Sequence, residues 1–142
     1  MILVDAGPLV AIVDVSDQHH RRCAAAWREV REPLGTVWPV VTEAMYLLLD
    51  LPRGQDAVWE ILERRAVRLL PLGEDDVPRM RELMAKYSDR PMHAADAALV
   101  RVAERDGLDT IFTVDDTDFA VYRREGRRRF QVIPGRARRR RR

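Results

Sequence analysis

The sequence predicts an α/β fold of three layers, in which a mostly parallel sheet of about five strands is covered by helices on both faces. Short apolar runs alternate along the chain with longer stretches of helical periodicity, which is typical of repeated strand–helix units. The apolar runs show no regular exchange with polar residues, so we expect both faces of the sheet to be buried. No internal linker is long enough to divide the chain.

The first part of the chain predicts a strand, a helical turn, a helix and a second strand. Residues 1–4 are a continuous apolar run, which favours a buried strand. Residues 8–13 predict a helical turn, and Ser16 or Asp17 is expected to cap the helix that follows. A short strand is then predicted at 35–38.

The middle of the chain predicts two helices and a third strand. Pro39 suits the first turn of a helix, where no backbone N–H is needed. Apolar residues recur at helical spacing as far as Leu51, and residues 52–54 are expected to end that helix. Another apolar face, which includes Val58, predicts a second helix before a strand at 67–72.

The last part predicts two more helices and two more strands. Residues 77–87 show one apolar helical face, and residues 88–91 break the chain. The next helix is expected to end at Gly107, because glycine is the usual residue just beyond a helix. Strands are predicted at 110–114 and 130–133, with an acidic and then basic loop between them.

The basic residues are concentrated at one end of the chain. Of the 25 lysines and arginines among 142 residues, six are arginines in the last seven positions. Without these six charges the formal net charge of +2 would become −4. We therefore predict one domain at 1–134 and a basic, disordered tail at 135–142. The tail either contacts phosphate backbones or is a passive solvated end.

The composition also favours a cytoplasmic protein. Cys23 is the only cysteine, which excludes an internal disulfide and fits a reducing compartment. No apolar run approaches the roughly 20 residues that a membrane-spanning helix needs, and no signal peptide is evident. We expect no association with a membrane.

Four acidic residues are placed where this fold would gather them at one edge of the sheet. Asp5 and Asp115 each follow a predicted strand, and Glu43 and Asp96 lie near the beginnings of two helices. Two carboxylates about 4 Å apart repel by roughly 4 kcal/mol at an effective dielectric near 20, so the set favours a bound cation. Ligands that are all oxygen favour Mg²⁺ or Mn²⁺. A metal in such a pocket can activate water, so we predict in-line hydrolysis of a phosphodiester.

Four short motifs contain these acids and occur in a fixed order along the chain. They span residues 2–10, 42–44, 89–100 and 111–119. Together they resemble the motifs of PIN-domain nucleases, and most closely those of the VapC toxins of bacterial toxin–antitoxin pairs. The similarity covers nearly the whole chain as far as Pro134.

The resemblance implies roles for individual residues and for partners. Asp5, Asp96 and Asp115 match the aspartates that hold the metal, and Glu43 matches a glutamate that binds metal, often through water, or orients the attacking water. Thr113 matches a hydroxyl position near the site. Relatives are endoribonucleases that cut single-stranded segments of structured RNA. They usually form homodimers, and a small cognate antitoxin, here of the VapB type, neutralises them with a tail that occupies the active-site groove.

Three positions near these acids leave alternatives open. His93 stands where many relatives carry an acid, so it either contacts metal or phosphate, or is an exposed or capping residue. Asp116 or Asp118 could replace Asp115 as the true ligand. Asp118 is otherwise expected to cap a helix or pair with an arginine at position 123 or 124.

Five arginines follow the acidic loop and offer a basic rim beside the predicted metal pocket. They are Arg123, Arg124, Arg127, Arg128 and Arg129. Such a rim would suit RNA phosphates, although simple solvation of a charged loop explains it equally well.

Other functions fit the residues less well. Phosphoryl transfer of the haloacid dehalogenase type needs a second aspartate two residues after the first, where this chain has Gly7. A response-regulator receiver needs a lysine after a late strand, and the only lysine, Lys86, lies in a helical stretch. A PIN-type RNA-processing nuclease that is not a toxin, or a catalytically inert RNA- or partner-binding module, remains as an alternative.

Overall fold

The computed structural model describes residues 1–135. The six arginines of the predicted tail lie outside the described residues. Five parallel strands form the central sheet in the order β3-β2-β1-β4-β7. They are β1 (Ile2–Val4), β2 (Leu34–Thr36), β3 (Arg68–Leu69), β4 (Thr110–Phe112) and β7 (Gln131–Ile133). The predicted fold class and all five predicted strands are therefore confirmed, although each strand is shorter than its apolar run.

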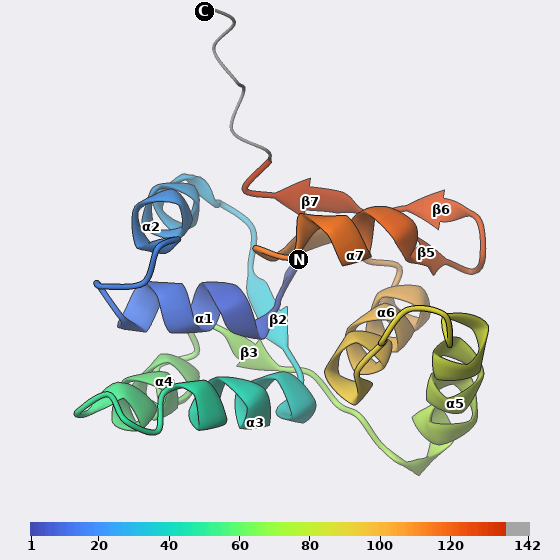
Figure 1. Cartoon of the computed structure of the whole chain (residues 1–142), viewed down its shortest axis with the longest axis horizontal. Coiled ribbons are helices and arrows are strands. Elements are labelled where there is room, and N and C mark those ends of the chain that lie inside the picture. Colours follow the sequence, from blue (N-terminus) through green and yellow to red (C-terminus); the bar gives the residue numbers. More distant parts are fainter. Residues whose placement is uncertain (136–142) are drawn as a thin grey trace, which may run out of the picture.

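Helices cover both faces of the sheet. On one side, to the left of the strands in Figure 1, lie α1 (Ala6–Val13), α2 (His20–Glu29), α3 (Trp38–Leu47) and α4 (Gly54–Glu63). On the other side lie α5 (Val77–Lys86), α6 (Ala94–Asp106) and α7 (Asp116–Val121). Right-handed crossovers explain this division, because the chain moves outward from β1 to β3 and then returns across the sheet to β4.

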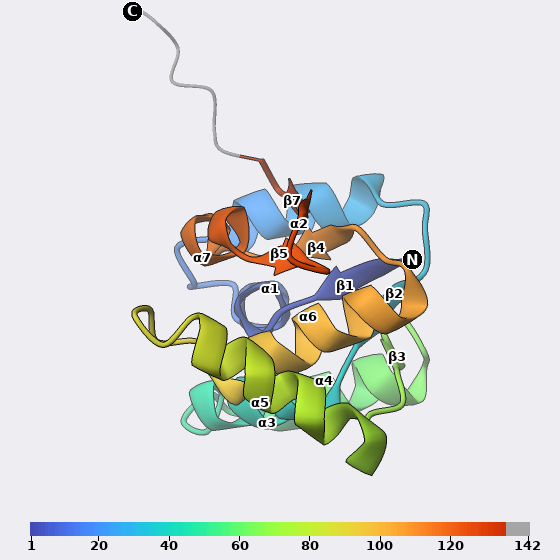
Figure 2. The same ribbon diagram turned by 90° about the vertical axis from the view of Figure 1, so that its right-hand side faces the viewer.

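Three smaller elements complete the described chain. A single 3-10 turn, η1 (Glu74–Asp76), leads into α5, and β5 (Arg123–Arg124) and β6 (Arg128–Arg129) form an antiparallel hairpin after α7. Figure 2 shows α5 and α6 side by side in front of the strands. Among the described residues, no helix is long and apolar enough to cross a membrane.

The main core cluster joins buried residues of α1, α2, α3 and α6 to those of the sheet. Leu3 of β1 and Phe112 of β4 are fully buried, and so are Leu99 and Val100 of α6. The smaller apolar cluster of Val41, Leu48 and Val58 joins α3 to α4. The central strands are thus covered on both faces, as their uninterrupted apolar sequences predict.

Several predicted boundaries are wrong. Neither Ser16 nor Asp17 caps α2, which begins at His20; Asp17 instead accepts a hydrogen bond from the His19 N–H (2.8 Å) in the preceding turn. α3 ends at Leu47, so Leu51 lies in the turn that precedes α4. The region predicted as a loop between the last two strands contains α7 and the β5–β6 hairpin.

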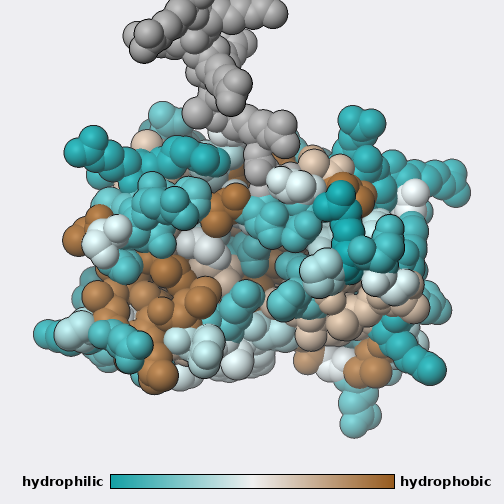
Figure 3. Space-filling model, viewed as in Figure 1, coloured by the Kyte–Doolittle hydropathy of each residue, from teal (hydrophilic) through white to brown (hydrophobic). Residues whose placement is uncertain are grey.

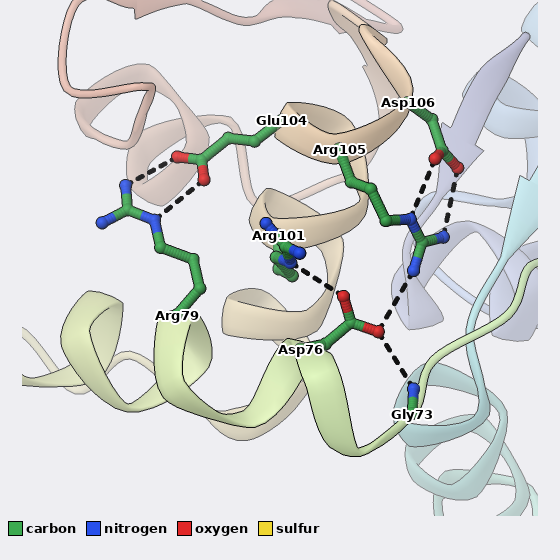
Figure 4. Close-up of polar contacts among 7 residues, drawn as sticks. All are labelled: Gly73, Asp76, Arg79, Arg101, Glu104, Arg105 and Asp106. Carbon is green, nitrogen blue, oxygen red and sulfur yellow. Dashed lines mark hydrogen bonds and ion pairs between the residues drawn. The ribbon is translucent and has the colours of Figure 1, made fainter.

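A cluster of ion pairs fastens η1 and α5 to α6 (Figure 4). Asp76, only 4% exposed, accepts hydrogen bonds from Arg101 Nε (2.8 Å), Arg105 (3.1 Å) and the Gly73 N–H (2.9 Å). The Gly73 N–H, followed by the Arg101 guanidinium, lowers the pKa of Asp76. Since α6 carries Asp96 at its other end, this cluster fixes a helix that forms part of the predicted site.

A second pair of contacts extends the same face of α6. Arg79 of α5 donates two hydrogen bonds to Glu104, at 2.9 and 2.8 Å, and Glu104 also accepts from the Glu125 N–H (2.9 Å). The Glu104 side chain is 7% exposed. Two-point guanidinium–carboxylate contacts of this kind are among the stronger polar contacts in proteins. Glu104 therefore joins α5, α6 and the β5–β6 hairpin.

Asp76→Asn should lower the free energy of unfolding at pH 7 by about 2 kcal/mol, because two arginines lose a buried anionic partner. The loss is measured by urea unfolding. Asp75→Asn, at an exposed position in the same turn, is the control and should change stability by less than about 0.5 kcal/mol. Because folding lowers the Asp76 pKa, its contribution is present above the ordinary pKa and is lost as the pH falls, so wild type and variant should converge below about pH 4. Equal losses in the two variants at pH 7 would contradict this role.

Candidate active site

Five carboxylates line one cavity of about 290 Å³ at the carboxyl ends of the strands. They are Asp5, Glu43, Asp96, Asp115 and Asp118. The four acids of the sequence motifs are thus brought together, with Asp118 beside them. β1 and β4 are neighbours, and the chain leaves β1 toward β2 on its other side. The cavity therefore lies where the strand order reverses, which is the usual ligand position in such a sheet.

Asp5 is the most deeply buried of these acids, with 8% of its surface exposed. It is the N-cap of α1: Oδ1 accepts a hydrogen bond from the Ala6 N–H (2.8 Å), and Oδ2 accepts one from the Thr113 hydroxyl (2.8 Å). Burial raises the pKa of Asp5 to about 7. The two hydrogen bonds oppose this rise, whereas the charges of Asp96 and Glu43 add to it.

Thr113 connects two strand ends. Its hydroxyl donates to Asp5 and accepts a hydrogen bond from the Asp115 N–H (3.0 Å), and its side chain is fully buried. The residue that the resemblance places near the site therefore lies between two of the acids. One hydroxyl can make both bonds because it has a donor and acceptors.

Asp96 lies in the first turn of α6, near the beginning of a helix as the sequence predicts. Its Oδ2 accepts from the His93 N–H (3.2 Å) and lies 3.5 Å from the buried Tyr122 hydroxyl. Burial raises the pKa of Asp96, and the His93 N–H opposes the rise. The positive end of the α6 dipole also favours a negative charge at this position.

Asp115 and Glu43 are the exposed members of the set. Asp115 is the N-cap of α7, and its Oδ1 accepts from the Asp118 N–H (3.3 Å). Partial burial, followed by the contact with Asp118, raises the pKa of Asp115. Glu43 projects from α3 on the opposite side of the sheet from α6 and α7. The cavity thus has a buried floor at Asp5 and accessible carboxylates at its walls.

Gly7 permits α1 to approach the end of β4 closely. A Cβ atom at this position would collide with Cγ2 of Val114. The stiff, β-branched valine has little freedom to move away. An aspartate two residues after Asp5, as a haloacid dehalogenase requires, would not fit here.

The structure shows the surroundings of His93 and Asp118, for which the sequence leaves alternatives open. His93 is the exposed N-cap residue of α6 and lines the cavity. The prediction that Asp118 pairs with Arg123 or Arg124 is wrong, because its ion-pair partner is Arg90, with Nη1 and Oδ1 3.5 Å apart. Sequence reasoning missed Arg90, although it lies inside the third motif, six residues before Asp96.

The five arginines predicted to bind RNA differ in how far their side chains are exposed to solvent. Arg124 is buried, and Arg123 donates to the carbonyl groups of residues 120–122 at the end of α7. Arg123 is half-buried, and only its Nη1 is engaged by these carbonyl groups. Arg127, Arg128 and Arg129 are exposed on the β5–β6 hairpin.

The donor set fits a hard divalent cation. All five acidic groups supply carboxylate oxygens, and repulsion among them contributes to the raised pKa values of Asp5, Asp96 and Asp115. A cation would relieve that repulsion. Within residues 1–135, however, no three acidic, histidine or cysteine side chains lie so that they could hold one metal ion together as they stand. The chain thus provides ligands of the right chemistry around an open cavity.

Residues 2–125 match the sequence model of the PIN domain. The chain belongs to the PIN-domain family. This PIN domain is also 29% identical to Ribonuclease VapC26 of Mycobacterium tuberculosis over 136 residues, which are 94% of this chain and 100% of that protein. The resemblance stated from the motifs is therefore confirmed.

Solved structures of similar shape support the same fold. VapC20 of Mycobacterium tuberculosis, described as a sarcin–ricin loop cleaving toxin, has a TM-score of 0.76 at 20% identity, covering 82% of this PIN domain and 91% of that chain. FitAcB from Neisseria gonorrhoeae has a TM-score of 0.58 at 23% identity, covering 82% and 88%. At these identities the likeness shows the three-layer fold alone.

The buried Asp5 should make the metal-free protein less stable as the pH rises. Its pKa of about 7 in the folded protein exceeds the ordinary value of 3.8, so the unfolded chain loses its proton first and stability falls as the pH rises through that range. The full difference corresponds to roughly 4 kcal/mol, of which about 3 kcal/mol falls between pH 5 and 8.

Urea unfolding in EDTA at pH 5 and 8 would measure this loss. Asp5→Asn should lose about 3 kcal/mol less than wild type over that interval, whereas Asp50→Asn, at an exposed position after α3, should behave as wild type. Mg²⁺ should restore stability at pH 8 in wild type more than in Asp5→Asn. The same pH dependence in wild type and Asp5→Asn would refute the assignment of the charge cost to Asp5.

Proposed function

We propose that this PIN domain is a Mg²⁺- or Mn²⁺-dependent endoribonuclease that hydrolyses RNA phosphodiester bonds as the toxin of a type II toxin–antitoxin pair. The observation that carries the proposal is the gathering of Asp5, Glu43, Asp96 and Asp115 around one open cavity. These four acids come from separate motifs of a PIN-domain sequence. The similarity to a ribonuclease VapC over nearly the whole chain supports the same activity.

In the proposed mechanism, Asp5, Asp96 and Asp115 would hold the cation, and Glu43 would contact it through water or orient the attacking water. When bound, the cation stabilises negative charge on the phosphodiester. Thr113 and the Ala6 N–H hold the Asp5 carboxylate in one orientation. Asp96 is held by the His93 N–H. Glu43, exposed and on a different helix, has the freedom to accept a hydrogen bond from water and turn it toward the phosphorus.

A cognate VapB-type antitoxin and a second copy of the chain are the proposed protein partners, in the cytoplasm. Figure 3 shows apolar side chains gathered over the α1, α3 and α4 side of the molecule. Tyr46, Leu47 and Leu49, at the end of α3 and just beyond it, are more than half exposed, and Leu47 also lines the acidic cavity. A partner that covers this patch would therefore reach the active site as well. One of the similar structures is that of FitAB bound to the IR36 DNA fragment, with a TM-score of 0.60 at 20% identity.

RNA contacts are proposed for Arg127, Arg128 and Arg129, which are exposed on the β5–β6 hairpin. We also propose that the nuclease domain ends near residue 134 and that the basic tail beyond it contacts RNA. The positive charges of the arginines there would add sequence-independent attraction to phosphates.

The second candidate is a PIN-type RNA-processing nuclease without an antitoxin, and the third is an inert binding module. The presence of all four acids disfavours the inert module. Gene context separates the first two: a short upstream reading frame that encodes a DNA-binding fold supports the toxin, and its absence supports the processing enzyme.

Purified protein should cut an end-labelled structured RNA internally in Mg²⁺ or Mn²⁺ and not in EDTA. Asp5→Asn and Asp96→Asn should each reduce the cleavage rate at least about a hundredfold, because each removes a charged ligand. Asp50→Asn is the matched control and should cut at the wild-type rate. Denaturing gels resolve the products. Full activity in either site variant would refute the metal assignment, and activity in EDTA would refute metal dependence.

A further inference from the structure

The acidic cavity leaves one requirement of the proposed reaction unmet, which is a positive group for the RNA backbone. Five carboxylates line the cavity, and His93 is the one lining residue that has a basic side chain. RNA brings at least one negative charge for each nucleotide that enters. Cations bound by the acids offset part of this repulsion, but phosphates next to the scissile bond need a positive partner at the rim.

Arg90 is placed to be that partner. Among the described residues, it is the one lysine or arginine that forms an ion pair with a carboxylate of the cavity wall, through Nη1 and Asp118 Oδ1. It precedes Pro91, which also lines the cavity. The guanidinium thus lies at the rim on the α6 side.

The contact between Arg90 and Asp118 is weak enough to be exchanged. It is one contact at 3.5 Å, between side chains that are 40% and 28% exposed. By contrast, Arg79 and Glu104 share two contacts below 3 Å, and Glu104 is 7% exposed. Exposed pairs contribute at most about 1 kcal/mol, whereas a guanidinium can contact a phosphate through two parallel hydrogen bonds.

The backbone that carries Arg90 is well fixed. Its N–H donates to the Tyr87 carbonyl (3.0 Å), and its own carbonyl accepts from the Met92 N–H (2.7 Å). Tyr87 and Met92 are both buried. The helices on either side of this loop are fastened together by the ion pairs of Figure 4. A long side chain on a fixed base can change partners without movement of the chain.

We propose that Arg90 is a substrate-binding residue that leaves Asp118 to contact a phosphate of the RNA strand beside the scissile bond. Asp118 holds the guanidinium at the rim in the absence of RNA. This inference rests on the proposed nuclease function and adds to it the group that recognises the backbone. Since a phosphate carries no base identity, the contact strengthens binding of any RNA that reaches the cavity.

Binding is measured with a fluorescently labelled hairpin RNA in Mg²⁺, using Asp5→Asn protein so that the RNA is not cut. In that background, Arg90→Ala should raise Kd about tenfold. The slope of log Kd against log salt concentration, measured between about 50 and 200 mM, should fall by about one, which corresponds to the loss of one phosphate contact. Arg90→Lys should keep the slope but lose part of the affinity, because lysine lacks the planar fork. Arg81→Ala removes the same charge from an exposed position on α5 and is the control. Thermal unfolding should be nearly unchanged in all of them, since the pair is partly exposed and makes one contact of 3.5 Å.

Asp118→Asn distinguishes a phosphate contact from a pair that only holds the loop. If Asp118 competes with RNA for the guanidinium, its removal should tighten binding, and most of that gain should vanish when Arg90 is also alanine. In otherwise wild-type protein, Arg90→Ala should raise KM with kcat within about twofold of wild type. The proposal would be overturned if Arg90→Ala had the same Kd and the same salt slope as Arg81→Ala. It would also be overturned if Arg90→Ala and Asp118→Asn both bound RNA more weakly.

The outcomes also separate this inference from the function on which it rests. If wild type cuts RNA in a metal-dependent way while Arg90→Ala binds like the control, the inference fails and the nuclease stands. If wild type neither binds nor cuts RNA, the proposed function fails and the role of Arg90 fails with it.

Discussion

The burial of the Asp5 carboxylate between the ends of β1 and β4 is the constraint on which the site depends. Asp5 accepts hydrogen bonds from the Ala6 N–H and the Thr113 hydroxyl, and these bonds do not compensate fully for its removal from water, since its pKa rises to about 7. Thr113 also accepts from the Asp115 N–H, so one hydroxyl ties the two strand ends and two acids together. The polar groups of the described residues at this edge of the sheet therefore stabilise the charge of the Asp5 carboxylate less well than water does.

The strongly paired charges of this molecule lie elsewhere, on the face of α6 that meets α5. Arg101 and Arg105 contact the buried Asp76, and Glu104 contacts Arg79 at two points. Asp96, at the start of the same helix, has a backbone N–H and a distant phenol as its partners. One helix therefore carries fully paired charges that hold it in place and an incompletely paired charge that faces the cavity. A rigid support and an unsatisfied carboxylate are what a cation site requires.

The sequence predicts the sheet well because the information is local. Each apolar run is short and uninterrupted, and the helical periodicity between runs allows few topologies. The topology in turn brings Asp5 and Asp115 together, because both follow neighbouring parallel strands. α7 was missed because its stability comes from Phe119 packing edge-on against Tyr122 and Phe130, contacts that no periodicity in six residues reveals. The pairing of Asp118 with Arg90 joins residues 28 positions apart and depends on the shape of the intervening helix, so local spacing favours a nearer arginine incorrectly.

The mutual repulsion of the cavity carboxylates is also what would give the cavity affinity for a cation. A proton and a divalent metal would compete for the same oxygens, so the affinity for a metal would rise as the pH increases through the raised pKa of Asp5. Replacing Asp5 by a neutral residue would remove both the repulsion and a proposed metal ligand, so stability and activity would change in opposite directions, as is common at functional sites. The fold tolerates this because its stability comes from the core between the helices and the sheet and from the Asp76 and Glu104 contacts. The Asp76 and Glu104 contacts involve no residue that lines the cavity. The protein can therefore keep an unfavourable group of carboxylates at one edge of the sheet, where only a positively charged occupant relieves it.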